Sequence, residues 1–239
     1  MIPLRDDAPV RTAPIMTMTA IGMCIVVFLW QLGQGRIGFQ LLPYSFGVVP
    51  VTLLGDYSLP PELRQVPPEI TLLTYMFLHG GWMHLLGNML YLWIFGDNVE
   101  EAMGHTRFVV FYLLCGIAAA LGQALLQPAA QIPMIGASGA VSGILGAYVL
   151  LYPHARVLVI IPFGFFMELI RMPALVVLGM WFVFQVLSSL LESGGQGGVA
   201  WFAHIVGFIA GVVLIPLFKQ RWVRLFQPGH HYRSWHRRL

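Results

Sequence analysis

The sequence predicts an all-α membrane protein: a bundle of six transmembrane helices with a long membrane-associated first loop. Three observations predict this class. Only 10% of the 239 residues are charged and 58% are hydrophobic, whereas a soluble domain carries roughly 25% charged residues. Six stretches approach the roughly 20 apolar residues that a membrane-spanning helix needs. The alternation of apolar and polar residues that is typical of a transmembrane barrel strand does not occur.

The predicted spans divide the chain into an arm, a membrane domain and a tail. We expect a polar cytoplasmic arm over residues 1–14, a six-helix membrane domain over residues 15–218 and a basic cytoplasmic tail over residues 219–239. Cys24 and Cys115 fall inside spans, where cysteine serves as a small apolar residue. The spans cover residues 15–32, 82–99, 108–127, 135–152, 173–191 and 199–218.

The connections between spans differ in character. The first span has no ionisable residue and is expected to be a structural wall. Residues 33–70 form a connection too long for an ordinary loop, yet rich in apolar residues, so we expect it to lie in the outer interface and partly in lipid rather than to be disordered. Residues 157–166 are apolar but too few to cross, and are expected to lie along the inner interface. Residues 192–198 hold four glycines and are expected to form a mobile loop.

The acidic residues Asp97, Glu100 and Glu101 close the second span. We expect them to form a solvated inner boundary with no catalytic role, and His105 and His154, at other inner span ends, to be solvated as well.

The distribution of positive charge predicts the orientation. An even number of spans places both termini on one side, and cytoplasmic termini leave only Arg36 and Arg64 of the 13 Lys and Arg residues outside. The positive-inside rule therefore predicts cytoplasmic termini, and we expect a multi-pass protein of the cell membrane. The basic tail is expected to contact anionic lipid, with no nucleic-acid partner.

Four polar residues lie near the beginnings of three spans and are expected at the same depth in the membrane. His84 and Asn88, Ser138, and His204 lie near the beginnings of the second, fourth and sixth spans, which all run from outside to inside. A rise of 1.5 Å per residue puts them within roughly 10 Å of the outer helix ends. Small residues recur every four positions on the fourth and sixth spans and allow close helix packing; they are Gly139, Gly143 and Ala147, and Ala203, Gly207 and Gly211.

A serine near a histidine is the arrangement of a nucleophile and its base. A serine hydroxyl is a weak nucleophile until a base removes its proton, and neutral imidazole can do so near pH 7. Burial disfavours the imidazolium cation and keeps the base form available. Since no Asp or Glu occurs in the outer half of any span, we predict a Ser138–His204 dyad whose histidine is oriented by packing.

Attack on a carbonyl produces an oxyanion, which needs hydrogen-bond donors. The candidates are the Asn88 amide, His84 and the backbone N–H of Ser138, which lies at a helix start where the first amides have no partner in the helix. Gly136 lets a substrate backbone come close. His79 is a further candidate for this part of the site, with anchoring at the interface as its alternative.

Each residue also has a simpler interpretation. A serine flanked by glycines in a membrane helix usually serves packing, and Asn88 alone could form an interhelical hydrogen bond. His204 is harder to explain without a function, because ionisable groups inside membranes are rare. A proton-conducting channel is a further alternative, but it predicts polar residues through the full membrane depth, and the inner halves of these spans are apolar.

Three motifs together resemble the rhomboid family of intramembrane serine proteases. The first places His79, His84 and Asn88 ahead of Leu92, Phe95 and Gly96. The second is the run 136–139, Gly-Ala-Ser-Gly, and the third places Ala203 and His204 ahead of Gly207 and Gly211. They occur in the family's order, and the resemblance covers about residues 15–218.

The resemblance implies a serine endopeptidase that cleaves single-pass transmembrane substrates in the lipid bilayer, without a metal or cofactor. It implies Ser138 as nucleophile, His204 as base, and His84 with Asn88 as oxyanion stabilisers. Two positions depart from the family: Ile70-Thr71 stands where many members have Trp-Arg, and Ser142 stands where many have an aromatic residue that packs on the histidine. A catalytically weak or inactive relative that binds membrane clients is the alternative function.

Overall fold

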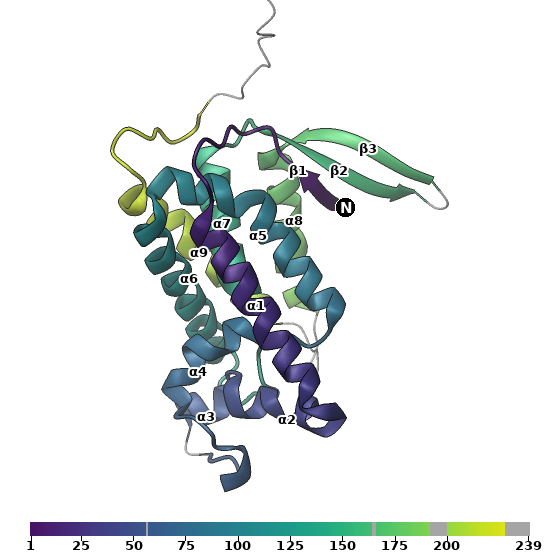
Figure 1. The fold of residues 1–239 in the computed structure, drawn as a ribbon, viewed down its shortest axis with the longest axis vertical. Helices are drawn as coiled ribbons and strands as arrows, with labels where there is room; N and C mark the ends of the chain where they lie inside the picture. Colours follow the sequence, from purple (N-terminus) through teal and green to yellow (C-terminus); the bar gives the residue numbers. More distant parts are fainter. Residues whose placement is uncertain (56, 164–165, 192–199, 228–239) are drawn as a thin grey trace, which may run out of the picture.

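The computed structural model describes residues 1–55, 57–163, 166–191 and 200–227, which are mostly helical (Figure 1). The predicted loop 192–198 and the predicted tail beyond residue 227 lie outside this part of the chain. Four helices are long and apolar enough to cross a membrane: α1 (Ile15–Gly33), α6 (His105–Leu126), α8 (Ala174–Leu191) and α9 (Trp201–Phe218).

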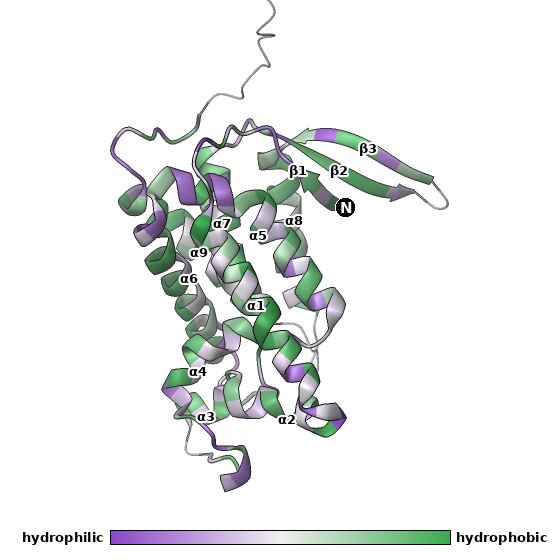
Figure 2. Ribbon diagram, in the orientation of Figure 1, coloured by the Kyte–Doolittle hydropathy of each residue, from purple (hydrophilic) through white to green (hydrophobic). Residues whose placement is uncertain are grey.

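Two further helices complete the bundle. α5 (Trp82–Met103) is apolar except for its acidic end, and α7 (Ser138–Leu151) is apolar but has only 14 residues. The helices run roughly side by side, and both ends of the described chain lie at the same end of the bundle (Figure 1). Hydrophobic residues dominate the middle of the helices, while hydrophilic residues gather towards the ends (Figure 2). This distribution is that of an integral membrane protein.

The connection after α1 folds into short helices at the opposite end of the bundle (Figure 1). Three of them begin with a proline, which suits the first helical position because its missing N–H would have no partner there. The elements are α2 (Gly35–Phe46), α3 (Pro50–Leu54), η1 (Pro61–Leu63), α4 (Pro68–Thr74) and η2 (Tyr75–Phe77), where η marks one-turn 3-10 helices.

This connection holds the segment that leads into α7. The backbone N–H of Val48 donates to the Met134 carbonyl over 3.0 Å, and the Met134 N–H donates back over 2.8 Å. The N–H of Gly136 donates to the Tyr75 carbonyl over 2.9 Å. These bonds satisfy backbone groups next to the helix start and so fix where Ser138 enters the bundle.

α7 and α9 pack backbone against backbone, as the small-residue pattern predicted. A methyl group added at Gly211 would overlap the carbonyl oxygen of Gly143, and one added at Gly207 would overlap that of Gly139. Only hydrogen fits at these crossings, so the two helices approach more closely than helices with larger side chains can. This approach brings the starts of α7 and α9 together.

The prediction of an all-α fold is wrong at the end that carries the termini. A three-stranded antiparallel sheet, in the order β1-β2-β3, forms from β1 (Ile2–Arg5), β2 (Arg156–Phe163) and β3 (Phe166–Pro173). Four β-branched residues in β2 favour a strand, and pairing with β1 and β3 satisfies its backbone groups. The sequence showed only that this segment was too short to cross.

The prediction that Glu100 is solvated is also wrong. Its side chain is 1% exposed and accepts the backbone N–H groups of Met16 and Thr17 over 2.9 and 2.8 Å, as well as the Thr17 hydroxyl over 2.6 Å. The carboxylate of α5 therefore caps the N-terminus of α1, where orphan N–H groups and the helix dipole favour negative charge. His105, which contacts Glu100, and His154 are exposed as expected.

Candidate active site

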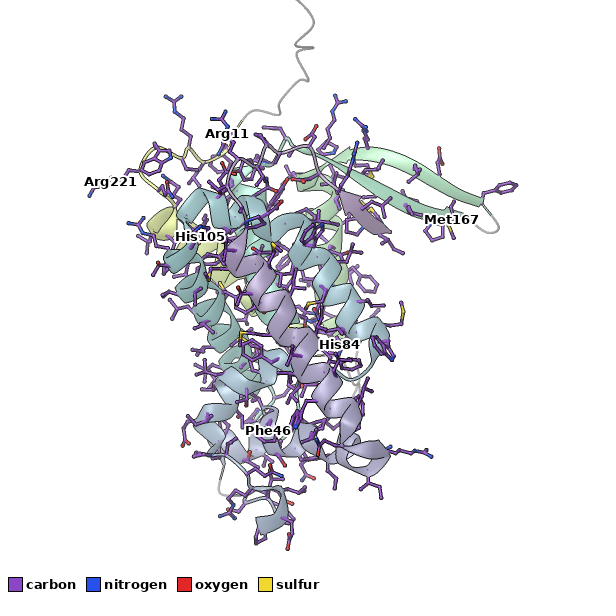
Figure 3. The ribbon with its side chains drawn as sticks, viewed as in Figure 1. Arg11, Phe46, His84, His105, Met167 and Arg221 are labelled. Carbon is purple, nitrogen blue, oxygen red and sulfur yellow. The ribbon has the colours of Figure 1, made fainter. Side chains whose placement is uncertain are left out.

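A cavity of about 640 Å³ opens among α5, α7, α8, α9 and the first connection. Its walls are mostly apolar, and its polar lining includes the four residues that the sequence placed at one depth: His84, Asn88, Ser138 and His204. Figure 3 shows His84 between Phe46 at one end of the molecule and Arg11 at the other, which carries the termini. The cavity thus lies towards the end of the bundle opposite the termini.

Ser138 and His204 are in hydrogen-bond contact. Ser138 Oγ lies 2.8 Å from His204 Nε2. Ser138 is the first residue of α7 and His204 lies in the first turn of α9. The close packing of these two helices therefore produces the contact. Both side chains are only partly buried and line the cavity.

Side chains of α8 and α9 surround the rest of the His204 ring. Its Nδ1 lies 2.7 Å from Oε1 of Gln185 in α8. The rings of Trp181 and Trp201 lie 6.0 and 6.2 Å from the imidazole, between ring centres. Sequence reasoning missed Gln185 and both tryptophans; the available signal was a lone amide within an otherwise apolar span. The aromatic packing absent at Ser142 is supplied by Trp181, and the Ser142 hydroxyl instead donates to the Ser138 carbonyl over 2.6 Å.

His84 and Asn88 lie on one face of α5 and meet Gly136. The N–H of Gly80 donates to His84 Nδ1 over 3.3 Å, so the neutral ring carries its proton on Nε2. Gly136 has φ +118°, a conformation that favours glycine, and a methyl group there would lie 2.5 Å from His84 Nε2 and 3.7 Å from Asn88 Nδ2. The Asn88 amide donates to the His84 carbonyl over 3.0 Å.

His79 lies behind this arrangement. Its ring packs edge-on against His84 with centres 5.2 Å apart, and its backbone exchanges hydrogen bonds with the side chain of Gln31 in α1. It is fully buried and does not line the cavity. Its Nε2 has no partner among the described residues. His79 can therefore reach the site only through the ring of His84.

The start of α7 adds backbone donors. Ser138 occupies the first helical position, so its N–H has no acceptor within the helix. This N–H lies at the positive end of the helix dipole. Within the described residues, no group of three or more His, Cys, Asp or Glu side chains could hold a metal ion.

These features define a class: an integral membrane protein whose apolar helices enclose a cavity lined in part by a serine and two histidines. Residues 68–221 match the Rhomboid domain. The chain belongs to the rhomboid family.

Named relatives agree with this assignment. The chain is 28% identical to "Rhomboid-like protein 11, chloroplastic" of Arabidopsis thaliana over 77% of this chain and 63% of the relative. It is 34% identical to "Rhomboid protease GluP" of Bacillus subtilis over 60% of this chain and 25% of the relative. It is 30% identical to "Putative rhomboid protease YdcA" of Bacillus subtilis over 65% of this chain and 70% of the relative. The chain thus spans less than two thirds of the first two.

Proposed function

We propose that this protein is an intramembrane serine endopeptidase that cleaves transmembrane protein substrates with a Ser138–His204 dyad. The observation that carries the proposal is the 2.8 Å contact between Ser138 Oγ and His204 Nε2 in a cavity among apolar helices. Membership of a family with many intramembrane proteases supports it.

The proposed reaction follows from the two atoms in contact. His204 Nε2 takes the hydroxyl proton while Ser138 Oγ forms a bond to the scissile carbonyl carbon. The peptide C–N bond then breaks, and the proton passes from Nε2 to the departing amine. Water, deprotonated by the same nitrogen, then attacks the acyl carbon; the bond from that carbon to Ser138 Oγ breaks, Nε2 returns the proton to Oγ, and the carboxylic acid product leaves. The cavity supplies the space for both the peptide and this water.

We assign the stabilisation of the oxyanion to the hydrogen-bond donors around Gly136. His84 Nε2 and the Asn88 amide nitrogen lie beside Gly136, and the backbone N–H of Ser138 lies two residues further on, at the start of α7. Donors held in place before the reaction need no reorganisation in the transition state, and losing one costs on the order of 3 kcal/mol in other serine hydrolases. Gly136 leaves room for the substrate oxygen between them. His79 is assigned the lesser role of supporting the His84 ring.

The membrane arrangement is part of the proposal. All six helices of the bundle would cross the membrane, and the 14-residue α7 would begin below the surface, at the cavity. The distribution of positive charge supports termini in the cytoplasm, in a cell membrane, and the cavity would then lie towards the outer side. The first connection would lie in the outer interface.

Reconstitution with a defined single-pass membrane protein tests the function. We expect wild type to cut the substrate, and Ser138→Ala and His204→Ala to leave it intact while unfolding at wild-type temperatures. Trp222→Phe is a matched control, because this exposed side chain is remote from the cavity lining. Cleavage by Ser138→Ala at the wild-type rate would refute the proposal. Binding of the substrate by all four proteins with no cleavage would favour the inactive, client-binding alternative.

A further inference from the structure

The contact between Gln185 and His204 carries chemistry beyond the dyad. Gln185 is 4% exposed, whereas α8 otherwise presents mostly apolar side chains to its surroundings. A buried amide in a membrane helix is costly unless it is hydrogen-bonded. Its Oε1 lies 2.7 Å from His204 Nδ1, which is the ring nitrogen that does not face Ser138.

An amide oxygen can only accept a hydrogen bond. The Gln185 contact therefore requires a proton on His204 Nδ1. A neutral imidazole carries one proton, so Nε2 keeps its lone pair, and that lone pair faces the Ser138 hydroxyl. The other tautomer would put a proton on Nε2 and could not take one from serine. The same reasoning gives His84 the opposite tautomer, because the Gly80 N–H donates to its Nδ1.

No carboxylate performs this task among the described residues around His204. Its two ring nitrogens lie within hydrogen-bond distance of Ser138 and Gln185, and the rings of Trp181 and Trp201 lie beside it. Trp181 and Gln185 are four positions apart on α8, so one helical face supplies both the ring packing and the hydrogen bond.

We infer that Gln185 is a positioning residue: its side-chain oxygen fixes the His204 tautomer that can act as base. This inference rests on the proposed function. It assigns to a neutral amide the orienting role that a carboxylate holds in a Ser-His-Asp triad. It also makes α8 part of the catalytic machinery, because the hydrogen bond persists only while α8 stays packed against α9.

Three variants test it in the reconstituted enzyme. Gln185→Met keeps the length but removes the acceptor, and we expect kcat to fall between about 10- and 1,000-fold with little change in KM, that is, by part of the roughly 100- to 10,000-fold that general-base catalysis contributes. Gln185→Glu keeps an acceptor and should retain activity within about tenfold of wild type. Leu187→Met, one half-turn further on and facing outward, is the matched control and should match wild type.

The pH profile separates positioning from a structural role. A carboxylate at position 185 stabilises the imidazolium that forms during the reaction, so the acidic limb of the kcat profile of Gln185→Glu should move to higher pH. A change that only altered packing would leave this limb where it is. Wild-type kcat in Gln185→Met, or a Gln185→Glu as inactive as Gln185→Met, would overturn the inference.

Nitrogen NMR reads the tautomer without any substrate. In protein labelled with ¹⁵N-histidine, the His204 signals, assigned by comparison with His204→Asn, should show a protonated Nδ1 in wild type and in Ser138→Ala, and mixed tautomers in Gln185→Met. A protonated Nε2 in wild type would overturn the inference. Failure of Ser138→Ala to lose cleavage would instead refute the proposed function, so the two failures are distinguishable.

Discussion

Two histidines in one cavity are held in opposite tautomers by the partner of their second nitrogen. His204 meets an acceptor, Gln185, and presents a lone pair to Ser138. His84 meets a donor, the Gly80 N–H, and presents an N–H towards Gly136. In the proposed reaction, the same side chain would therefore serve as a proton acceptor at one position and as an oxyanion donor at the other. Roles differ here because local hydrogen bonds differ.

Gly136 is the residue at which this arrangement is most sensitive to added volume. Gly136→Ala places a methyl group 2.5 Å from His84 Nε2 and forces an unfavourable positive φ. We expect turnover to fall about tenfold or more, because the displaced donors no longer meet the oxyanion. The measurement is kcat in liposomes, alongside the unfolding temperature.

Gly22→Ala is the control for that experiment, since the space around Gly22 in α1 is open. It should leave turnover and unfolding unchanged. A Gly136→Ala protein that turns over as fast as wild type would contradict the assignment of the oxyanion site.

The residue scale is also where sequence reasoning reached furthest. Ser138, His204, His84 and Asn88 were found because polar groups at one depth in apolar spans are rare, and the structure brings all four to one cavity. Gln185 differs from its neighbours in the sequence only as a lone amide in an apolar span. Its partner could not be found, because α8 and α9 meet through three-dimensional packing that has no local sequence signal.

At the scale of elements, the crossing of α7 and α9 sets the geometry of the site. Gly211→Ala inserts a methyl group against the Gly143 carbonyl, so the helices must separate or tilt. We expect a loss of stability on the order of 1–3 kcal/mol and a larger proportional loss of cleavage, because the Ser138–His204 contact depends on this approach. Unfolding in detergent and kcat in liposomes measure the two effects.

Gly179→Ala, in the open surroundings of α8, is the matched control for this crossing. Equal stability and activity in Gly211→Ala and Gly179→Ala would show that the close approach does not set the site.

The β2–β3 hairpin extends sideways from the bundle, with Met167 near its far end (Figures 1 and 3). Register places Ile2, Ile160 and Leu169 side by side on one face, together with Met167, which is 77% exposed. Arg171 borders this face, and Glu168 points to the other. An exposed apolar face bordered by an arginine, at the end of a helix bundle, suits a membrane interface. The sequence analysis predicted the inner interface for this segment.

Site-specific fluorescence tests the placement of the hairpin. A probe attached at Met167→Cys should be quenched strongly by nitroxide on lipid headgroups, and a probe at Glu168→Cys, one residue along and on the opposite face, should be quenched less. The native Cys24 and Cys115 are buried and should not react. Equal, weak quenching at both positions would place the hairpin away from the membrane.

Elements were predicted unevenly, for a physical reason. A membrane-spanning helix is recognisable in a sequence as a run of about 20 apolar residues. The bundle helices therefore start and end within a few residues of the predicted spans, although α7 starts later and α5 ends later than predicted. The sheet was missed because β1 pairs with residues more than 150 positions away, and nothing in residues 1–14 indicates that partner.

At the scale of the whole molecule, the N-terminal arm ties together the helices that carry the site. The Tyr148 hydroxyl of α7 donates to the Asp6 carboxyl, and the Arg156 N–H donates to Asp7 over 2.7 Å. Glu100 of α5 meanwhile caps α1. The end of the bundle that carries the termini is thus joined by polar contacts, while its middle is joined by apolar packing.

These polar contacts predict a pH dependence of stability. Burial raises the pKa of Asp6 from 3.8 to about 6, an effect that the Tyr148 hydrogen bond opposes only in part. The folded state therefore binds this proton more tightly than the unfolded state. The resulting stabilisation is present below about pH 4 and is lost as the pH rises through about 6, by on the order of 3 kcal/mol.

Asp6→Asn removes this titration and keeps an oxygen that can accept the Tyr148 hydrogen bond. The unfolding temperature of wild type in detergent should fall between pH 4.5 and 7.5 more steeply than that of the variant. Glu62→Gln, at an exposed position, should follow wild type. Identical slopes in wild type and Asp6→Asn would remove Asp6 from the explanation.

The central claim is that Ser138 is a nucleophile activated by His204, and covalent labelling tests it most directly. The purified protein in lipid is treated with a fluorophosphonate and digested, and the modified residue is identified by mass spectrometry. We expect an adduct on Ser138 in wild type, and we expect Ser138 to be labelled at least about tenfold more slowly in His204→Ala. Labelling of Ser138 at the same rate in both proteins, or cleavage of a substrate by a protein whose Ser138 never reacts, would contradict it.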